Sequence, residues 1–323
     1  MKLGCKLQII IYDVEVWIHI YKEKVMKKVK IITDSCSDLT AELLEKYNID
    51  YVKMNTVEDG VQSPAELTWS YEDAHRLYDT IRSGKRITTT QVSVEEFITV
   101  FTKYLEEGYD IVYIGCASKQ SGSVNTGAVT ARNLLEKYPE SKIYCIDALN
   151  ASIGEGMLAI EAAKLAEEGK SADEINAHIL SVRKTVQEFA TVHTLEHLKK
   201  AGRVSAPSAF FGNLMGVKPI LVADTEGAQA AFKKVKGRQN SMKEIVELLS
   251  ENILDPENST VYLAHADCSA DEVDALKEMI MEKISPKEIY TCIIGPIIGA
   301  SVGPDTIGVW AFGKPVTFTA EEK

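Results

Sequence analysis

The chain has 323 residues, and its 36 lysines and arginines against 47 aspartates and glutamates give a formal net charge of −11. This acidic balance argues against a general nucleic-acid binder, which needs a basic face to displace counterions. Six cysteines without a C-x-x-C pair are too few for a disulfide scaffold, so we expect free thiols in a reducing cytoplasm.

The first 28 residues differ in texture from the rest of the chain. Residues 7–20 are largely apolar but include Asp13 and Glu15, and they are shorter than the ~20 residues that a membrane-spanning helix needs. Stable membrane insertion is therefore not expected. No A-x-A cleavage site follows, so a signal peptide is not expected either. Residues 1–28 are interpreted as an N-terminal extension, in which residues 1–25 are dispensable or disordered and Met26 is a second start. An edge strand over residues 8–20 is the alternative.

From residue 29 onward, short apolar runs alternate with amphipathic helical stretches. Strands are predicted at 29–33, 50–55, 110–114 and 142–146, and helices at 41–47, 71–81, 94–105, 124–138, 156–168 and 172–186. Thr40 is a candidate N-cap for the first of these helices. Strands separated by helices of this length imply a parallel sheet with helices on both faces.

After residue 186 the pattern changes to that of an α+β unit. Strands are predicted at 189–192, 261–264, 289–293 and 306–312, short helices at 195–200 and 206–214, a hairpin over 217–235, and helices at 241–253 and 271–283. The predicted fold is α/β, with an N-terminal parallel sheet flanked by helices over residues 29–172. A C-terminal α+β domain is predicted over 173–323.

An apparent zinc-peptidase signature fails its structural context. His193 and His197 have H-x-x-E-H spacing, but zinc binding needs both on one helical face. His193 ends a strand-like run, and the helix begins only after it. A strand-end histidine and a helix-surface histidine are therefore expected, and no metal site is predicted.

Two apparent nucleotide signatures fail in the same way. Gly154-Glu-Gly156-Met-Leu-Ala159 resembles a dinucleotide loop, but the acid expected ~20 residues later falls in a predicted helix. These glycines are interpreted as allowing close packing of a helix start. Gly169-Lys-Ser171 links two helices and lacks the first glycine of a phosphate-binding loop, so no cofactor is predicted.

Four loops rich in hydroxyl groups are expected to converge at one edge of the fold. They cover residues 33–38, 88–93, 117–123 and 299–304. Three precede helices, whose N-terminal amides favour an anion; an N-cap or turn residue is the alternative role for any single Ser or Thr. Asp34 and Asp147 are the acids at strand ends, and capping or loop bracing is the favoured role for both. Such a crevice suits holding a carboxylate or phosphate rather than performing chemistry on it.

At these loops the chain resembles the DegV family of fatty-acid-binding proteins, over about residues 28–315. The matching pieces are Ile-Thr-Asp-Ser at 32–35, Thr-Thr-Gln at 89–91, Ser121-Gly122, Asp147 with Gly154 and Gly156, Leu195-Glu-His-Leu-Lys-Lys-Ala-Gly-Arg203, Val217-Lys-Pro-Ile220 and Ile294-Gly-Pro-Ile-Ile-Gly299. Each piece is weak alone, but their order and spacing together are specific.

The resemblance implies one long-chain fatty acid buried between two domains, with its carboxylate held by Thr89 and Ser121. Thr90, Gly122 and Ser301 are further candidate ligand-binding residues. The resemblance also implies a carrier, not itself an enzyme, that presents the acid to a fatty-acid kinase, and the kinase supplies the ATP site. We expect a monomer. Two departures from the family pattern are Val92 in place of a proline and Ser301 in place of a histidine.

Arg203 is the candidate residue for contact with the kinase, because it aligns with the family's Gly-Arg and belongs to a basic cluster with Lys199 and Lys200. A second basic cluster covers residues 233–238. The alternative function is a small-molecule phosphotransferase or hydrolase that uses the same crevice, and a regulatory module is a third. A catalytic base would separate an enzyme from a carrier, and the hydroxyl loops contain no histidine.

Overall fold

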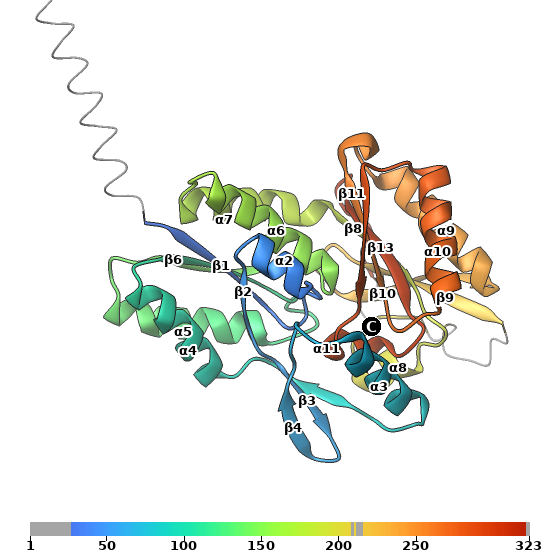
Figure 1. Cartoon of the computed structure of the whole chain (residues 1–323), viewed down its shortest axis with the longest axis horizontal. Coiled ribbons are helices and arrows are strands. Elements are labelled where there is room, and N and C mark those ends of the chain that lie inside the picture. Colours follow the sequence, from blue (N-terminus) through green and yellow to red (C-terminus); the bar gives the residue numbers. More distant parts are fainter. Residues whose placement is uncertain (1–26, 208–209, 211–215, 321–323) are drawn as a thin grey trace, which may run out of the picture.

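The computed structural model describes residues 27–207, 210 and 216–320 (Figure 1). The extension predicted over 1–28 lies almost wholly outside these residues, as does most of the short helix predicted over 206–214. The described chain forms a parallel sheet, a larger mixed sheet and a small antiparallel sheet, which confirms the α/β class. No helix within the described ranges is long and apolar enough to cross a membrane.

The N-terminal sheet has four parallel strands in the order β2-β1-β6-β7. They are β1 (Val29–Asp34), β2 (Asp50–Val52), β6 (Asp110–Gly115) and β7 (Ile143–Asp147). β6 is buried throughout, as is typical of a central parallel strand covered on both faces. Neighbouring residues such as Ile31 and Ile32 therefore enter different core clusters on opposite faces.

Helices cover both faces of this sheet (Figure 1). One face carries α2 (Ala41–Lys46), α6 (Ile153–Glu167) and α7 (Ala172–Val182), and the other carries α4 (Val94–Glu106) and α5 (Ser123–Lys137). The side chain of Thr40 accepts a hydrogen bond from the Leu43 amide, so the predicted cap of α2 is confirmed. The helix predicted to reach residue 186 ends at Val182 and continues as one 3₁₀ turn, η1 (Arg183–Thr185).

A small antiparallel sheet in the order β4-β3-β5 was not predicted from the sequence. Its strands are β3 (Asn55–Glu58), β4 (Val61–Pro64) and β5 (Thr88–Thr90), and α3 (Tyr71–Arg82) lies between β4 and β5 in the chain. The expected loop over 88–93 therefore begins as a strand paired with β3. Asp59 and Gly60 turn the β3–β4 hairpin with positive φ angles of 49° and 82°. Asp-Gly is a strong hairpin signal, and it could have revealed these strands.

The C-terminal sheet has six strands in the order β10-β9-β8-β13-β11-β12, all antiparallel except the β11–β12 pair. They are β8 (Val186–Thr191), β9 (Val217–Ala223), β10 (Gln229–Lys236), β11 (Thr260–His265), β12 (Glu288–Ile293) and β13 (Ile307–Phe312). The predicted β9–β10 hairpin is confirmed. α9 (Arg238–Asn252) and α10 (Ala270–Lys283) cover the outer face, and η3 (Pro256–Asn258) precedes β11.

The inner face of this sheet meets the N-terminal unit. Along β13, Ile307 and Val309 pack beneath α9 and α10, whereas Trp310 packs into the core shared with the first unit. This alternation is the period-two pattern of a strand. Two short helices, α8 (Glu196–Ala201) and α11 (Pro296–Val302), lie near this junction (Figure 1).

The loop predicted over 299–304 is wrong over its first four residues, because α11 extends to Val302. A Cβ added at Gly299 would lie 2.5 Å from the Tyr78 hydroxyl oxygen, so glycine is needed for α3 to approach α11. Tyr78 in turn donates a hydrogen bond of 2.6 Å to the Ile294 carbonyl, just before α11. Gly299, which the sequence analysis assigns to a loop, therefore allows two helices to pack closely.

Candidate ligand-binding site

A cavity lies between the inner face of the six-stranded sheet and the N-terminal unit. The space between its wall atoms amounts to about 930 Å³, which includes space open to solvent. Apolar wall residues include Met54, Ala190, Leu198, Leu221, Ile297 and Trp310. The six-stranded sheet and both short helices therefore contribute to one cavity.

Most of the predicted site residues line this cavity. They are Thr89, Ser121, Gly122, Ser301 and Arg203. Thr90 is not in the wall: Thr89 and Thr90 follow each other on β5, so their side chains point to opposite faces. The Thr90 hydroxyl instead accepts a hydrogen bond of 3.4 Å from the side-chain amide of Asn55 on β3. The structure therefore does not place Thr90 beside Thr89 at the cavity.

The segments that carry Thr89 and Ser121 are tied together. The Val92 amide donates to the Ser123 hydroxyl at 3.2 Å, and the Ser123 and Ser121 hydroxyl oxygens are 2.9 Å apart. A Cβ added at Gly122 would lie 2.0 Å from Gln91 Oε1, so the Gln91 side chain packs directly against this glycine. Since α5 begins at Ser123, its N-terminal amides lie next to Ser121 and favour an anion there.

Ser301 lies in a different setting from the one predicted. It occupies the last turn of α11 rather than a loop beyond a strand. Within the described chain, neither the Ser301 hydroxyl nor the Thr89 hydroxyl makes a hydrogen bond. Both therefore remain available to a ligand in the cavity.

A second, basic pocket adjoins the cavity and shares Thr89, Ser301 and Arg203 with it. The basic side chains in its wall are Lys85, Arg86, His197, Lys200 and Arg203, and no aspartate or glutamate lines it. The side chains of this pocket are therefore positively charged overall, whereas the whole chain has a net charge of −11. The pocket has the composition of an anion site.

Arg203 is held at the boundary between the cavity and the basic pocket. Its Nε donates to the Gln120 carbonyl at 3.2 Å and its Nη1 to the Ala201 carbonyl at 2.6 Å. Neither Arg203 nor Arg86 forms an ion pair with a carboxylate of the described residues. Lys85, by contrast, is already paired with Glu58 and Asp59.

His197 is a residue of this pocket that the sequence reasoning missed. It lies on α8, and its ring is 2.4 Å from where a Cβ of Gly303 would be, so glycine makes room for it. Burial lowers the pKa of His197, and the nearby Lys200 lowers it further. The position of His197 in this pocket could not be predicted from the sequence, because only the fold brings α8 next to the end of α11.

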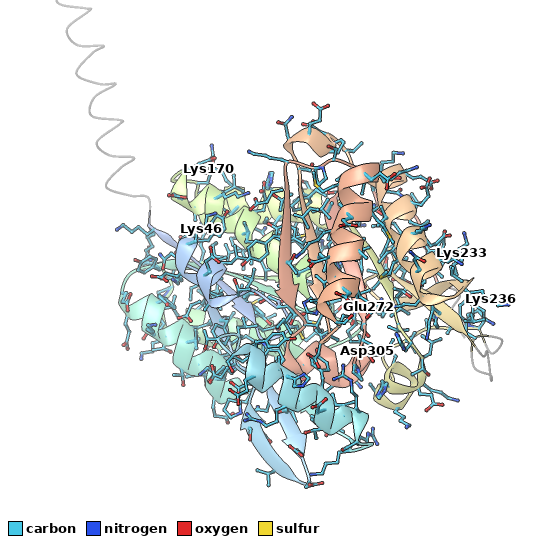
Figure 2. The ribbon with its side chains drawn as sticks, turned by 45° about the vertical axis from the view of Figure 1, so that its right-hand side comes forward. Lys46, Lys170, Lys233, Lys236, Glu272 and Asp305 are labelled. Atoms are coloured by element: carbon cyan, nitrogen blue, oxygen red, sulfur yellow. The ribbon has the colours of Figure 1, made fainter. Side chains whose placement is uncertain are left out.

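The second basic cluster does not belong to either pocket. Lys233 and Lys236 lie at the outer edge of the six-stranded sheet on β10 (Figure 2). Arg238 donates instead to Glu272 Oε1 at 2.8 Å and to the Asp305 carbonyl at 2.7 Å. Lys233 and Lys236 therefore lie away from both pockets.

The two strand-end acids brace loops, as predicted. Asp34 accepts hydrogen bonds from the Cys36 and Cys116 amides and from the Tyr113 hydroxyl. Burial raises the pKa of Asp34, and these hydrogen bonds oppose the rise. Asp147 Oδ1 accepts from the amides that follow β6 and β7 at 3.2 and 2.9 Å.

Two groups of side chains in the described ranges have the spacing of metal ligands. Cys36, Cys116 and Glu155 are fully buried, and burial raises the pKa of Glu155, which disfavours its anionic form. In the other group, Asp267 already pairs with Arg82 and His75. The predicted separation of His193 and His197 is confirmed, since His193 follows β8 and only His197 lies on α8.

The glycine-rich segment at the start of α6 packs closely, as predicted. A Cβ at Gly156 would lie 2.7 Å from the Ser37 carbonyl oxygen, and one at Gly154 would lie 3.0 Å from Trp310 Cδ1. Gly169 to Ser171 joins α6 to α7, where the Ser171 hydroxyl caps α7. Neither segment therefore forms a nucleotide loop.

The fold is α/β with a cavity between two units, and comparison with known proteins assigns the family. The family model described as "Uncharacterised protein, DegV family" matches residues 28–314. A DegV domain-containing protein of Clostridium perfringens is 34% identical over 292 residues, which cover 89% of this chain and 98% of the relative. The chain belongs to the DegV family.

Solved structures agree with this assignment. A DegV lipid-binding protein from Thermotoga maritima superposes with a TM-score of 0.78 at 27% identity, over 90% of this chain and 100% of that one. A fatty-acid-binding DegV protein from Thermus thermophilus gives 0.78 at 26% identity, over 88% and 99% of the two chains. Both are binding proteins for lipids, as the resemblance implied.

Proposed function

We propose that this chain binds one long-chain fatty acid in the cavity, with its carboxylate near Thr89, Ser121 and Ser301. The observation that carries the proposal is the cavity itself, which combines an apolar wall with the Thr89 and Ser301 hydroxyl groups, neither of which makes a hydrogen bond within the described chain. The fatty-acid-binding relatives support the same ligand class.

The apolar wall supplies most of the affinity in this proposal. Burying about 15 methylenes, taken as an illustration, gains roughly 12 kcal/mol before the costs of ordering the chain. Each hydrogen bond from a hydroxyl group to the charged carboxylate adds only about 1.5–3 kcal/mol. The cavity therefore sets affinity, and the hydroxyl groups set the orientation of the head group.

The proposal extends to a partner, a fatty-acid kinase that phosphorylates the bound acid in the cytoplasm. A carboxylate oxygen would attack the γ-phosphorus of ATP, forming an acyl phosphate and releasing ADP. The basic pocket supports this step, because it adjoins the head group and contains Arg86 and Arg203 without paired acids. A guanidinium can bind a phosphate through two parallel hydrogen bonds. This chain acts in the proposal as a carrier rather than as the enzyme.

The double variant Thr89→Ala with Ser121→Ala tests the head-group site. Loss of two hydrogen bonds to the carboxylate should weaken palmitate binding by at least about a hundredfold in a calorimetric titration. Thr99→Ala with Ser181→Ala is the matched control, because both of these hydroxyls are exposed and bond only within their own helices. Unchanged palmitate affinity in the first variant, with an unchanged unfolding temperature, would remove these residues from the site.

Arg203→Ala tests the kinase encounter. We expect acyl-phosphate formation by the cognate kinase to fall by at least tenfold, and far more than palmitate affinity does. Arg132→Ala on the exposed surface of α5 is the control for loss of one positive charge. A variant phosphorylated at the normal rate, or one that loses its lipid in proportion, would show that the assigned role is wrong.

A further inference from the structure

The cavity wall contains a polar pair that the head-group site does not use. Glu188 on β8 and Trp310 on β13 are directly opposite each other in the antiparallel register, and both line the cavity. Glu188 is 7% exposed and Trp310 is 2% exposed. Glu188 Oε2 and Trp310 Nε1 each lack a hydrogen-bond partner among the described residues. The wall thus presents one acceptor and one donor, both out of contact with bulk water.

Both side chains are held in place by their neighbours. The Gln229 amide donates to Glu188 Oε1 at 2.8 Å, which fixes the carboxyl group and leaves Oε2 unused. The indole lies over Gly308 and beside Gly154, where added Cβ atoms would be 2.7 and 3.0 Å from its ring. Two glycines therefore make room for the indole, and its N–H has little freedom to seek another partner.

The pair does not satisfy itself. Burial raises the pKa of Glu188 to about 7, while Gln229 and the neighbouring indole oppose that rise. No hydrogen bond of acceptable geometry joins Trp310 Nε1 to Oε2. Buried polar groups in native proteins nearly always have partners, so an unpaired donor beside an unpaired acceptor indicates a missing group that can serve both.

We propose that this pair recognises a hydroxyl group on the acyl chain, so that the preferred ligand is a hydroxylated long-chain fatty acid. The inference rests on the proposed function, since it assumes an acyl chain in this cavity. The hydroxyl oxygen accepts from Trp310 Nε1, and its O–H donates to Glu188 Oε2. A plain methylene at this place leaves both polar atoms unpaired, which is the basis for discrimination against unsubstituted chains.

The test compares stearate with a positional series of hydroxystearates, bearing the hydroxyl at carbon 3, 10 or 12. The measured quantity is the ratio of the two dissociation constants for each variant of the delipidated protein. At least one hydroxystearate should bind wild type about tenfold more tightly than stearate. Trp310→Phe removes the donor and keeps an aromatic ring, and Glu188→Leu removes the acceptor. Each should bring the ratio close to one.

Trp69→Phe is the control, because Trp69 is a partly buried tryptophan outside the cavity wall. It should keep the wild-type ratio. Equal binding of stearate and the whole series by wild type would overturn the proposal, and this result does not depend on whether a variant folds. A ratio that persists in both Trp310→Phe and Glu188→Leu would overturn it too. Failure of wild type to bind stearate and every hydroxystearate would instead overturn the proposed function.

Discussion

Two buried carboxyl groups, those of Glu188 and Asp38, make the stability of this protein depend on pH. Burial raises the pKa of Glu188 from its ordinary 4.5 to about 7, and it raises the pKa of Asp38 to about 7 as well. At a pH between the ordinary pKa of each group and its raised pKa, the folded chain holds a proton that the unfolded chain has released. The stability that each group contributes is therefore complete below its ordinary pKa, 4.5 for Glu188 and 3.8 for Asp38, and is lost as the pH rises through 7.

Glu188→Gln should remove the share that Glu188 contributes to this pH dependence. The amide keeps the size of the carboxyl group but does not ionise. Relative to wild type, the free energy of unfolding of the variant should rise by on the order of 3 kcal/mol between pH 4.5 and pH 8. Urea denaturation across this range measures it, with the exposed Glu167→Gln as the control. Parallel stability curves for variant and wild type would contradict the assigned burial effect.

At the level of elements, α6 depends on close contact with the loop after β1. Gly156→Ala should destabilise the protein by about 1–2 kcal/mol, because the added Cβ would lie 2.7 Å from a backbone oxygen. This is opposite in sign to the gain of about 1 kcal/mol that alanine usually brings to a helix interior. Denaturant unfolding decides the sign, and Glu167→Ala in the same helix should change stability by less than ~0.5 kcal/mol. A Gly156→Ala variant more stable than wild type would refute this packing.

Elements with a clear sequence period were predictable, and elements fixed by distant contacts were not. The 71–81 and 94–105 helices differ from α3 and α4 by a single residue at one end, because their apolar spacing and serine caps are local features. α11 was missed because its seven residues include Gly299, whose role depends on Tyr78 more than 200 positions away. Length and tertiary contact outweighed local propensity there.

The candidate site was predictable in part for the same reason. The spacing of the hydroxyl-rich segments and the family resemblance pointed to Thr89, Ser121 and Ser301, and these line one cavity. The Glu188–Trp310 pair and His197 could not be predicted, since strand register and helix packing alone bring them to the pockets. The structure differs from the prediction at Thr90 because residues 88–90 form the strand β5 rather than a loop, and side chains alternate along a strand.

At the scale of the whole molecule, ion pairs join the two units. Arg82 on α3 bonds to Asp267 at 2.6 Å and to Asp305 at 2.7 Å, both in the C-terminal unit, and the Asp267 side chain is only 3% exposed. α7 packs on α6 and β7, so we propose that the division between units falls near residue 183 rather than after residue 172. The cavity lies along this same junction.

Arg82→Met should therefore destabilise the protein by about 1–3 kcal/mol. The change leaves the buried Asp267 carboxylate with His75 as its only remaining ion-pair partner in the described ranges, and the partial exposure of Arg82 moderates the loss. Arg76→Met on the same helix removes an exposed pair with Asp73 and should cost less than ~1 kcal/mol. Equal losses in the two variants, measured by urea unfolding, would contradict a special role for this junction.

The central claim is that a fatty acid occupies the cavity between the units, and native mass spectrometry of the full chain tests it most directly. The purified protein, or the delipidated protein after incubation with long-chain and hydroxylated fatty acids, should carry one acyl ligand per chain. Collisional release should then identify that ligand as a long-chain carboxylic acid. A chain that remains without ligand under both conditions, while correctly folded by circular dichroism, would contradict the account.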